Sequence, residues 1–514
     1  MRAKASIAAN PASRARRLGA AVTALVLVVS CSSATPGSPS GSPSASQEGA
    51  SASPSEVASP TSPVSPSPSA SSTIAGTWIQ SGKLKVARIA PHLVLLRNDR
   101  VLVVGNDNHC TELEDPSGKI ISQRGALPES VRAELWNAST SAWTMTRSLD
   151  KPRDHFGAVV LANGRVLVAG GVNQGIYSDD YHPLGYVGHQ SFSSAWTFDP
   201  KRNAWSRTSL MNTARTDPSI ALLTDGRVLV AGGIYEDYLR EWTGAGTGST
   251  MTAGAAMTGT GSSDTRAGRF ADVGPSGPPV PILSTAELYD PRTDTWTRTG
   301  SMHHARSGAV AVTLTDGRVL VVGQSPDTLA ADRASWDHPY LPDPAAFKTA
   351  ELFNPRTGRF SLTGSLPAAV ASFSLVALDD GGALLIGGYP MTTEKPPVRT
   401  VLRFDPKTKD WTRVDSLATA RANALAVRLA DGRVLVAGGE SPYGPTASAE
   451  LFDPATGRWS ALPSMPAPRA WGAAILLRDG SVLIVGGYGP RRAGMTEVTC
   501  PTGLATSVRF VPTP

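Results

Sequence analysis

Asp-Gly-Arg-Val-Leu-Val-Ala-Gly-Gly, from Asp431 to Gly439, is the stretch that decides the fold of this chain. The same nine residues stand at Asp225–Gly233, and altered copies recur along the sequence. A self-similar unit at roughly 50-residue spacing indicates a repeat architecture rather than one irregular domain. The altered copies are Asn98–Asn106, Asn163–Gly171, Asp316–Gln324, Asp380–Gly388 and Asp479–Gly487.

Each repeat continues with further shared features. A second motif, Ala-Glu-Leu-aromatic-Asp/Asn-Pro, stands at Ala286–Pro291, Ala350–Pro355 and Ala449–Pro454. An aromatic residue and then an arginine follow. The aromatic residues are Trp143, Trp205, Trp296, Phe360, Trp411 and Trp459. The arginines are Arg153, Arg215, Arg306, Arg421 and Arg469, with Val370 in the repeat that lacks one.

The unit predicts four short antiparallel strands. Val-Leu-Val is apolar on both faces, as expected of a strand covered on both sides. Asp-Gly or Asn-Gly before it predicts a tight hairpin, and segments such as Asp453–Gly457 predict turns. A four-stranded unit repeated around an axis is the blade of a β-propeller. The Gly-Gly, aromatic and Trp spacing resembles the kelch repeat over roughly residues 76–514, so we expect an all-β, kelch-type β-propeller.

The ring is expected to be closed by an N-terminal strand. Interior strands beginning at Val101, Val166, Val228, Val319, Leu384, Val434 and Val482 predict seven blades. The last repeat ends after a third strand at Ser507–Phe510, whereas Gly76-Thr77-Trp78-Ile79 resembles a spare fourth strand. Thr77–Gln80 is therefore predicted to complete the seventh blade.

Residues 1–30 are expected to be an export leader. A basic start is followed by the apolar run Ala20–Val29 and by Ser30-Cys31. This end resembles a bacterial lipobox, which implies cleavage before Cys31 and lipidation of its thiol. The alternatives are an uncleaved membrane anchor or a buried cysteine. Residues 31–75 are then the acylated cysteine and a Ser/Pro-rich tether, whose composition predicts disorder. We therefore expect an extracytoplasmic protein, lipid-anchored to the bacterial cell membrane.

Charge and cysteine usage agree with that location. The net charge is +6, and the leader carries five basic and no acidic residues, so the mature chain is near 6 − 5, or about +1. This balance gives no support to nucleic-acid binding. Cys110 and Cys500 fall in loops of the first and last blades, which are neighbours in a closed ring. A disulfide between them is predicted in an oxidising compartment; two unpaired thiols are the alternative.

Binding residues are expected in the loops between second and third strands. These loops are long in early blades and short at Tyr389–Arg399 and Glu440–Ala447. Aromatic rings, imidazoles and carboxylates suit stacking on a sugar or anchoring a protein. The alternative is that such rings pack on one another within their loops. The candidates are Tyr177, Tyr181, His182, Tyr235, Trp336, His338 and Tyr340.

Two roles are possible for the repeated arginines, among which we include Arg88. They could encircle the axis and hold anions, or each could pair with a glutamate of its own blade, such as Glu134, Glu287, Glu351 or Glu450. The blade with Val370 also has Leu402 in place of glutamate, which favours the ion pair. Arg153 and Arg469 have Trp196 and Val508 where the glutamate is expected, so these two are predicted to bind ligand.

Catalysis is not the favoured reading. Kelch-type folds include copper-radical oxidases resembling galactose oxidase, which need two Tyr, two His and a cross-linked Cys. Here the Tyr-His dipeptide, Tyr181-His182, lies in an early blade. We expect no catalytic residue, metal or cofactor, and predict a propeller that binds a glycan or a protein. A carbohydrate-active enzyme of the same fold is the alternative.

Overall fold

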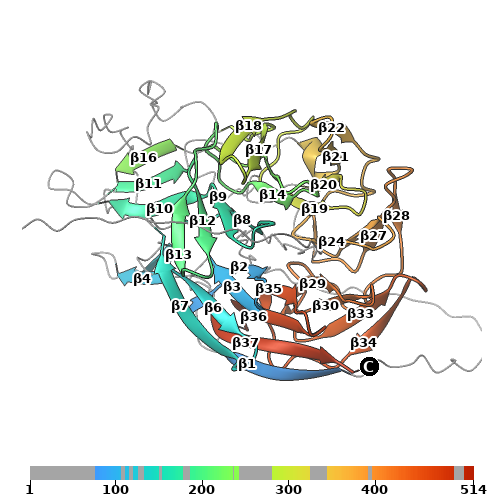
Figure 1. Ribbon diagram of the computed structural model, residues 1–514. Coiled ribbons are helices and arrows are strands. Elements are labelled where there is room, and N and C mark those ends of the chain that lie inside the picture. Colours follow the sequence, from blue (N-terminus) through green and yellow to red (C-terminus); the bar gives the residue numbers. More distant parts are fainter. Residues whose placement is uncertain are drawn as a thin grey trace, which may run out of the picture.

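The structure is a computed structural model, and it describes residues 76–105, 110–114, 120–124, 132–149, 153–177, 186–235, 237–241, 281–323, 344–391, 396–490 and 503–513. Strands dominate this part of the chain, and seven four-stranded antiparallel sheets surround a common axis (Figure 1). The predicted all-β, seven-bladed propeller is confirmed. The lipobox, the tether and Cys500 lie outside the described residues.

Each blade is a meander in which the innermost strand comes first. Blade 1 contains β2 (His92–Leu95), β3 (Arg100–Val104), β6 (Arg132–Asn137) and β7 (Ala142–Ser148). Blade 2 contains β8 (Gly157–Val160), β9 (Val166–Ala169), β12 (Ala195–Asp199) and β13 (Ala204–Arg207). Blade 3 contains β14 (Ser219–Leu222), β15 (Val228–Ala231), β17 (Ala286–Asp290) and β18 (Thr295–Arg298). Blade 4 contains β19 (Val310–Thr313), β20 (Val319–Val322), β21 (Ala350–Asn354) and β22 (Arg359–Leu362).

The last three blades follow the same order. Blade 5 contains β24 (Ser374–Ala377), β25 (Ala383–Ile386), β27 (Val401–Phe404) and β28 (Trp411–Arg413). Blade 6 contains β29 (Leu425–Arg428), β30 (Val434–Ala437), β33 (Ala449–Asp453) and β34 (Arg458–Leu462). Blade 7 contains β35 (Ala470–Leu476), β36 (Val482–Tyr488), β37 (Leu504–Pro512) and β1 (Gly76–Arg88).

The Val-Leu-Val runs, or the variants Ala383–Ile386 in blade 5 and Val482–Val485 in blade 7, form the second strand of each blade, and both faces of these strands are covered. Every residue of β9, β15 and β30 is buried. Their side chains fill the apolar layers between neighbouring blades, for example Leu435 and Ala437 with Ile484 and Phe510. In blades 2 to 7 the hairpin before this strand turns at a glycine of positive φ, such as Gly432 at 89°, where a Cβ would be strained. In blade 1 the residue of positive φ is Asp99, at 57°.

The N-terminal strand closes the ring as predicted. β1 pairs antiparallel with β37, with Trp78 opposite Phe510. Their rings lie 5.0 Å apart, the same spacing as Phe452 to Trp459 in blade 6. The innermost strands contact one another in chain order, and β35 contacts β2. The last blade is therefore built from both ends of the domain (Figure 1).

In several blades the recurring tryptophan joins its blade to the one before it. The indole N–H of Trp205 donates to the carbonyl of Arg147 at 3.0 Å. Trp296 donates to Ser209 and Trp459 to Asp415 in the same way. Trp78 donates to Pro463, so the closing strand makes the same link.

Additional short sheets lie on the face that carries the second-to-third strand loops, here called the loop face. β10 (Val172–Tyr177) and β11 (Tyr186–Ser191) form a hairpin inserted in blade 2, and β16 (Asp237–Glu241) comes from the loop of blade 3. β16 pairs with β11, so the loops of these two blades share one sheet. β4 (Cys110–Glu114) and β5 (Ile120–Arg124) form a hairpin from blade 1.

Two further pairs complete the loop face. β23 (Val370–Ala371) pairs with β26 (Tyr389–Pro390), and β31 (Glu440–Ser441) pairs with β32 (Gly444–Pro445). The short 3-10 helix η4 (Pro344–Phe347) precedes β21. No helix in the described part of the chain is both long and apolar enough to cross a bilayer.

Candidate functional site

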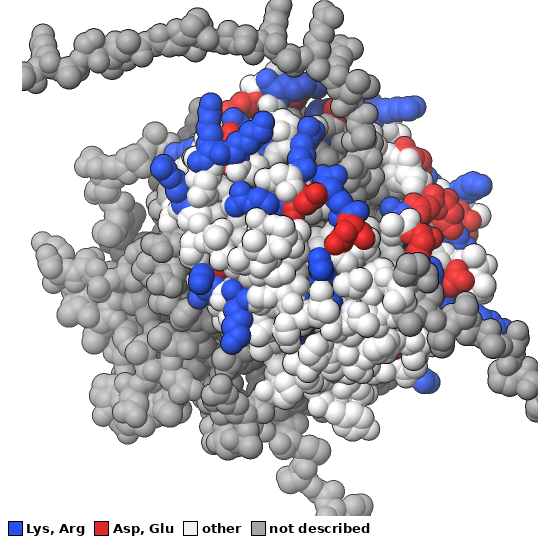
Figure 2. Space-filling view, turned by 60° about the horizontal axis from the view of Figure 1, so that its bottom comes forward, with Lys and Arg blue, Asp and Glu red and all other residues white. Residues whose placement is uncertain are grey.

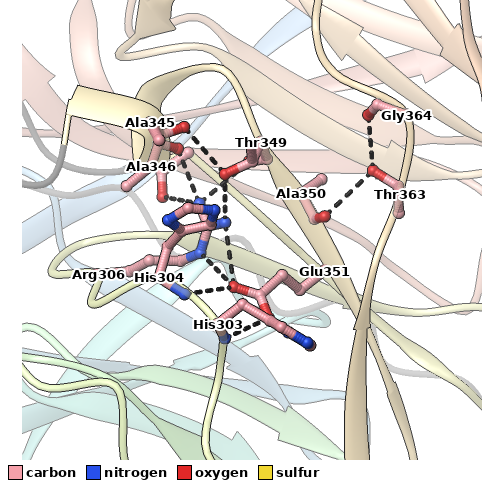
Figure 3. Close-up of polar contacts among 11 residues, drawn as sticks. His303, His304, Arg306, Ala345, Ala346, Thr349, Ala350, Glu351, Thr363 and Gly364 are labelled. Carbon is pink, nitrogen blue, oxygen red and sulfur yellow. Dashed lines mark hydrogen bonds and ion pairs between the residues drawn. The ribbon is translucent and has the colours of Figure 1, made fainter.

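The repeated arginines are structural anchors. Arg306 is 1% exposed and donates to the carbonyls of Gly323, Ala346 and Thr349 and to the carboxylate of Glu351 (Figure 3). Glu351 also accepts the backbone N–H groups of His303 and His304, at 2.8 and 3.1 Å. The ion pair therefore fastens the blade-connecting loop to the third strand.

The same pair recurs inside three other blades. Arg88 pairs with Glu134, Arg215 with Glu287 and Arg421 with Glu450. In blade 5, Val370 and Leu402 are both buried in one apolar cluster. The predicted ion pair is confirmed in all four cases, and Arg88, the last residue of β1, binds the glutamate of blade 1, the blade that follows it.

Arg153 and Arg469, whose blades have Trp196 and Val508 at the glutamate position, are bound by backbone carbonyls. Arg153 donates to the carbonyls of Gly170 and Ser194, and its guanidinium lies 4.6 Å from the ring centre of Phe192. Arg469 donates to the carbonyls of Gly486 and Thr506. Burial lowers the pKa of Arg469 to about 10. Both side chains are 1% exposed, and their predicted role in binding stays a prediction.

A ring of left-handed residues surrounds the axis on the loop face. Two positions after each arginine, or after Val370, the backbone has positive φ, and in several places the N–H donates to the carbonyl of the equivalent residue in the preceding blade. Such a conformation is an outlier for a bulky residue and is often found at functional sites. The ring residues are Ala90, His155, Asp217, Gly308, Ser372, Asn423 and Trp471.

Two ring residues form an acid–base pair. Nδ1 of His155 lies 2.9 Å from Oδ1 of Asp217, and both side chains are partly exposed. His92 lies nearby, with its ring 4.9 Å from that of Phe156. Burial lowers the pKa of His92 to about 4, although the Phe156 carbonyl and Asp217 act in the opposite direction. The backbone ring therefore brings an imidazole and a carboxylate together on this side of the axis.

On the opposite part of the ring, a carboxylate lies between two phenols. Tyr389 from blade 5 and Tyr488 from blade 7 donate their O–H groups to different oxygens of Glu440 from blade 6. Proximity to Glu440, added to the larger effect of burial, raises the pKa of Tyr389, which keeps it a donor. Trp471 packs edge-on against Tyr488, with ring centres 6.3 Å apart. The cluster presents aromatic surface and negative charge together.

The residues predicted from sequence fall beside this region or outside the described part. Tyr177 ends β10, opposite Tyr186. Tyr235 follows β15 on the loop face and is 39% exposed. Cys110 begins β4. The other candidates lie outside the described residues: Tyr181, His182, Trp336, His338 and Tyr340.

The residues that converge at the axis are not among the candidates predicted from the sequence. Tyr389 and Glu440 lie in loops set aside because they are short, and Tyr488 is the last residue of a strand. His155, Asp217 and Trp471 occupy the same position of the repeat as Ala90 and Gly308. The backbone conformation at this position is therefore repeated, whereas the residue type varies from blade to blade. Comparing residues two places after each repeated arginine would have found the ring.

The charged surface gives no sign of a single-sign interface on the side that can be seen. Figure 2 shows Lys and Arg interspersed with Asp and Glu on the upper part of the visible side, and a broad uncharged area below them. Several charged groups in the described part of the chain pair locally, as Arg433 does with Asp431. Within the described ranges, no group of three or more His, Cys, Asp or Glu side chains comes together to hold a metal ion.

Comparisons with known proteins agree with the fold. The Kelch motif family matches residues 423–466. "N-acetylneuraminate epimerase" of Pasteurella multocida is 24% identical over 305 residues, covering 55% of this chain and 75% of that protein. "Spermatocyte protein spe-26" of Caenorhabditis elegans is 27% identical over 118 residues, 22% of this chain and 19% of that one.

Among solved structures, a fungal alcohol oxidase of the AA5 family in complex with copper superposes with a TM-score of 0.54 at 19% identity. The match covers 85% of this chain and 76% of the oxidase chain. At this identity the similarity shows the propeller fold alone, and the copper belongs to that protein.

Proposed function

We propose that this chain, a seven-bladed kelch-type β-propeller, is a lipid-anchored protein of the bacterial cell envelope that binds a glycan over the axis of its loop face. The observation that carries the proposal is the convergence of Tyr389, Glu440 and Tyr488 from three consecutive blades at one carboxylate. Aromatic faces and hydroxyl-accepting carboxylates are the groups that recognise sugar rings. A protein partner is the other ligand that such a surface could hold.

The loop architecture supports a site on this side of the propeller. The insertions of blades 2 and 3 share one sheet on the loop face, and Tyr235, in the loop of blade 3, is 39% exposed. Concave sites occur where loops from several elements surround an opening. We expect Tyr177, Tyr181, His182, Trp336, His338 and Tyr340 to contribute from the same sector. The buried Arg153 and Arg469 would position the loops that carry the binding residues.

A glycan array probed with residues 76–514 tests the proposal. Tyr181→Ala and Trp336→Ala should weaken binding of the selected glycan by roughly 1–3 kcal/mol, as loss of a stacked ring does. The control is Tyr443→Ala, because this side chain is 99% exposed at a hairpin tip on the same face. Glycan binding that survives both changes but is abolished by Tyr443→Ala would locate the site elsewhere on the ring. Binding to no glycan would refute the proposal.

A carbohydrate-active enzyme is the second candidate, and the His155–Asp217 pair favours it. A carboxylate that orients an imidazole is an arrangement used in general acid–base catalysis. The similarity to an N-acetylneuraminate epimerase directs the test to free sugars. Their anomeric interconversion, followed by NMR, should accelerate with the protein and lose that acceleration in His155→Ala. An oxidase would instead show stoichiometric copper and a tyrosyl radical signal.

A further inference from the structure

We propose that Glu440, Tyr389, Tyr488 and Trp471 form a site for a protonated amine on the ligand, so that the recognised sugar is an amino sugar. The inference rests on the proposed glycan-binding function and specifies the charge of its ligand.

Glu440 differs from the glutamates that recur in the third strands of the blades. Glu134, Glu287, Glu351 and Glu450 are buried, and each pairs with an arginine. Glu440 is only partly buried, and its side-chain contacts within the described part of the chain are the two phenol O–H groups. Its charge is therefore not neutralised by a cation from that part of the molecule. A half-buried carboxylate of this kind favours a cationic ligand.

Hydrogen-bonding capacity remains on the carboxylate. An ionised carboxylate offers about four acceptor positions. Tyr488 occupies one on Oε1 and Tyr389 one on Oε2. The remaining positions can accept N–H groups of an ammonium ion, which carries three donors when it is primary. The two phenols hold the carboxylate in place before the ligand arrives, so little ordering is needed on binding.

The aromatic rings favour an organic cation. Tyr389 and Tyr488 converge on the same carboxylate, and Trp471 stands at 70° to Tyr488. Rings arranged in this way attract ammonium groups through their negative faces. A divalent metal ion is a poorer match, because calcium takes six to eight oxygen ligands and the described side chains here supply one carboxylate and two phenols. Trp471 is 9% exposed and has the left-handed conformation at φ 56°, and its backbone N–H donates to the carbonyl of Asn423 in the preceding blade.

Binding of three probes to the purified full-length protein tests the inference by isothermal titration calorimetry at pH 7 and fixed ionic strength. Glucosamine carries the sugar and the ammonium group, N-acetylglucosamine is its neutral counterpart, and choline carries the cation without the sugar. Glucosamine should bind at least about tenfold more tightly than N-acetylglucosamine, as expected from a cation–π contact together with a carboxylate. Choline should bind measurably and compete with glucosamine.

Substitutions of the site residues test whether these side chains cause the preference for glucosamine. Glu440→Gln should remove the preference for glucosamine, and Trp471→Leu should weaken choline and glucosamine alike. Asp431→Asn is the matched control, because it changes the charge equally in the same blade but lies in the hairpin on the opposite face. Tyr389→Phe keeps the ring and removes one donor to the carboxylate. It provides a second variant if Glu440→Gln fails to fold, and it should lower the preference by several-fold.

The outcomes separate this inference from the broader proposal. Equal affinity for glucosamine and N-acetylglucosamine would overturn the amine site while glycan binding stands. Absence of glucosamine and choline binding would also overturn it, even if the array identifies a neutral glycan. A glucosamine preference that persists in Glu440→Gln would refute the assignment to this carboxylate.

Discussion

Replacing Glu351 by valine should destabilise blade 4. The size of the loss can be derived from Arg469, the equivalent arginine of blade 7. The variant would give Arg306 the surroundings of Arg469, which has a threonine at the corresponding position and Val508 in place of glutamate. Burial lowers the pKa of Arg469 from 12.5 to about 10, which corresponds to about 3 kcal/mol against the charged form. The N–H groups of His303 and His304 would also lose their acceptor, adding about 1 kcal/mol.

The expected cost of Glu351→Val is therefore about 4 kcal/mol, within the range for breaking a buried ion pair. Blade 5 supplies the compensating change, since Val370 and Leu402 replace both partners there. The double variant Arg306→Val/Glu351→Leu should recover most of the loss, because no unpaired charge remains buried. Urea unfolding followed by tryptophan fluorescence measures both, with Asp431→Asn as a surface control worth at most about 1 kcal/mol.

Two results would refute this reasoning. A loss below about 1 kcal/mol for Glu351→Val would mean that the ion pair is dispensable. A double variant as unstable as the sum of the two single changes would mean that burial of charge is not the cause of the loss.

Further predictions concern pH, closure and export. The folded-state pKa of His92, about 4 against an ordinary 6.5, means that the unfolded chain binds more protons between these values. Stability should therefore fall by about 3 kcal/mol as pH drops from 6.5 to 4, and His92→Phe should remove this part of the dependence in urea midpoints measured at pH 7 and 4. Deleting residues 76–84 should expose the edge of β37 and cause aggregation; a truncated chain with an unchanged melting temperature would contradict the closure. A Cys110–Cys500 disulfide should stabilise by about 4–5 kcal/mol, and free thiols at both positions in exported protein, found by peptide mapping, would exclude it. Cys31→Ala should abolish processing or membrane attachment, and a mature variant still in the membrane fraction would show that the lipobox interpretation is wrong.

The sequence by itself determined the architecture, because the blades of a propeller share one geometry and therefore share one sequence pattern. Val-Leu-Val recurs wherever a second strand must be covered on both faces, and Trp78 could be matched to Trp459 before their contacts were known. The joint change at Val370 and Leu402 showed that arginine and glutamate act as a pair, because burying either charge alone is unfavourable.

Tertiary structure alone decided what meets at the axis. Tyr389, Glu440 and Tyr488 belong to three blades and are separated by 51 and 48 residues. No local pattern joins them, and the ring position that carries His155 and Trp471 carries Ala90 and Gly308 elsewhere. Arg153 and Arg469 lacked a glutamate in sequence, yet backbone carbonyls supplied partners that residue types cannot reveal. The side chains that meet at the axis come from different blades and need not be of the same type in each blade. A repeated sequence pattern therefore does not predict which side chains meet there.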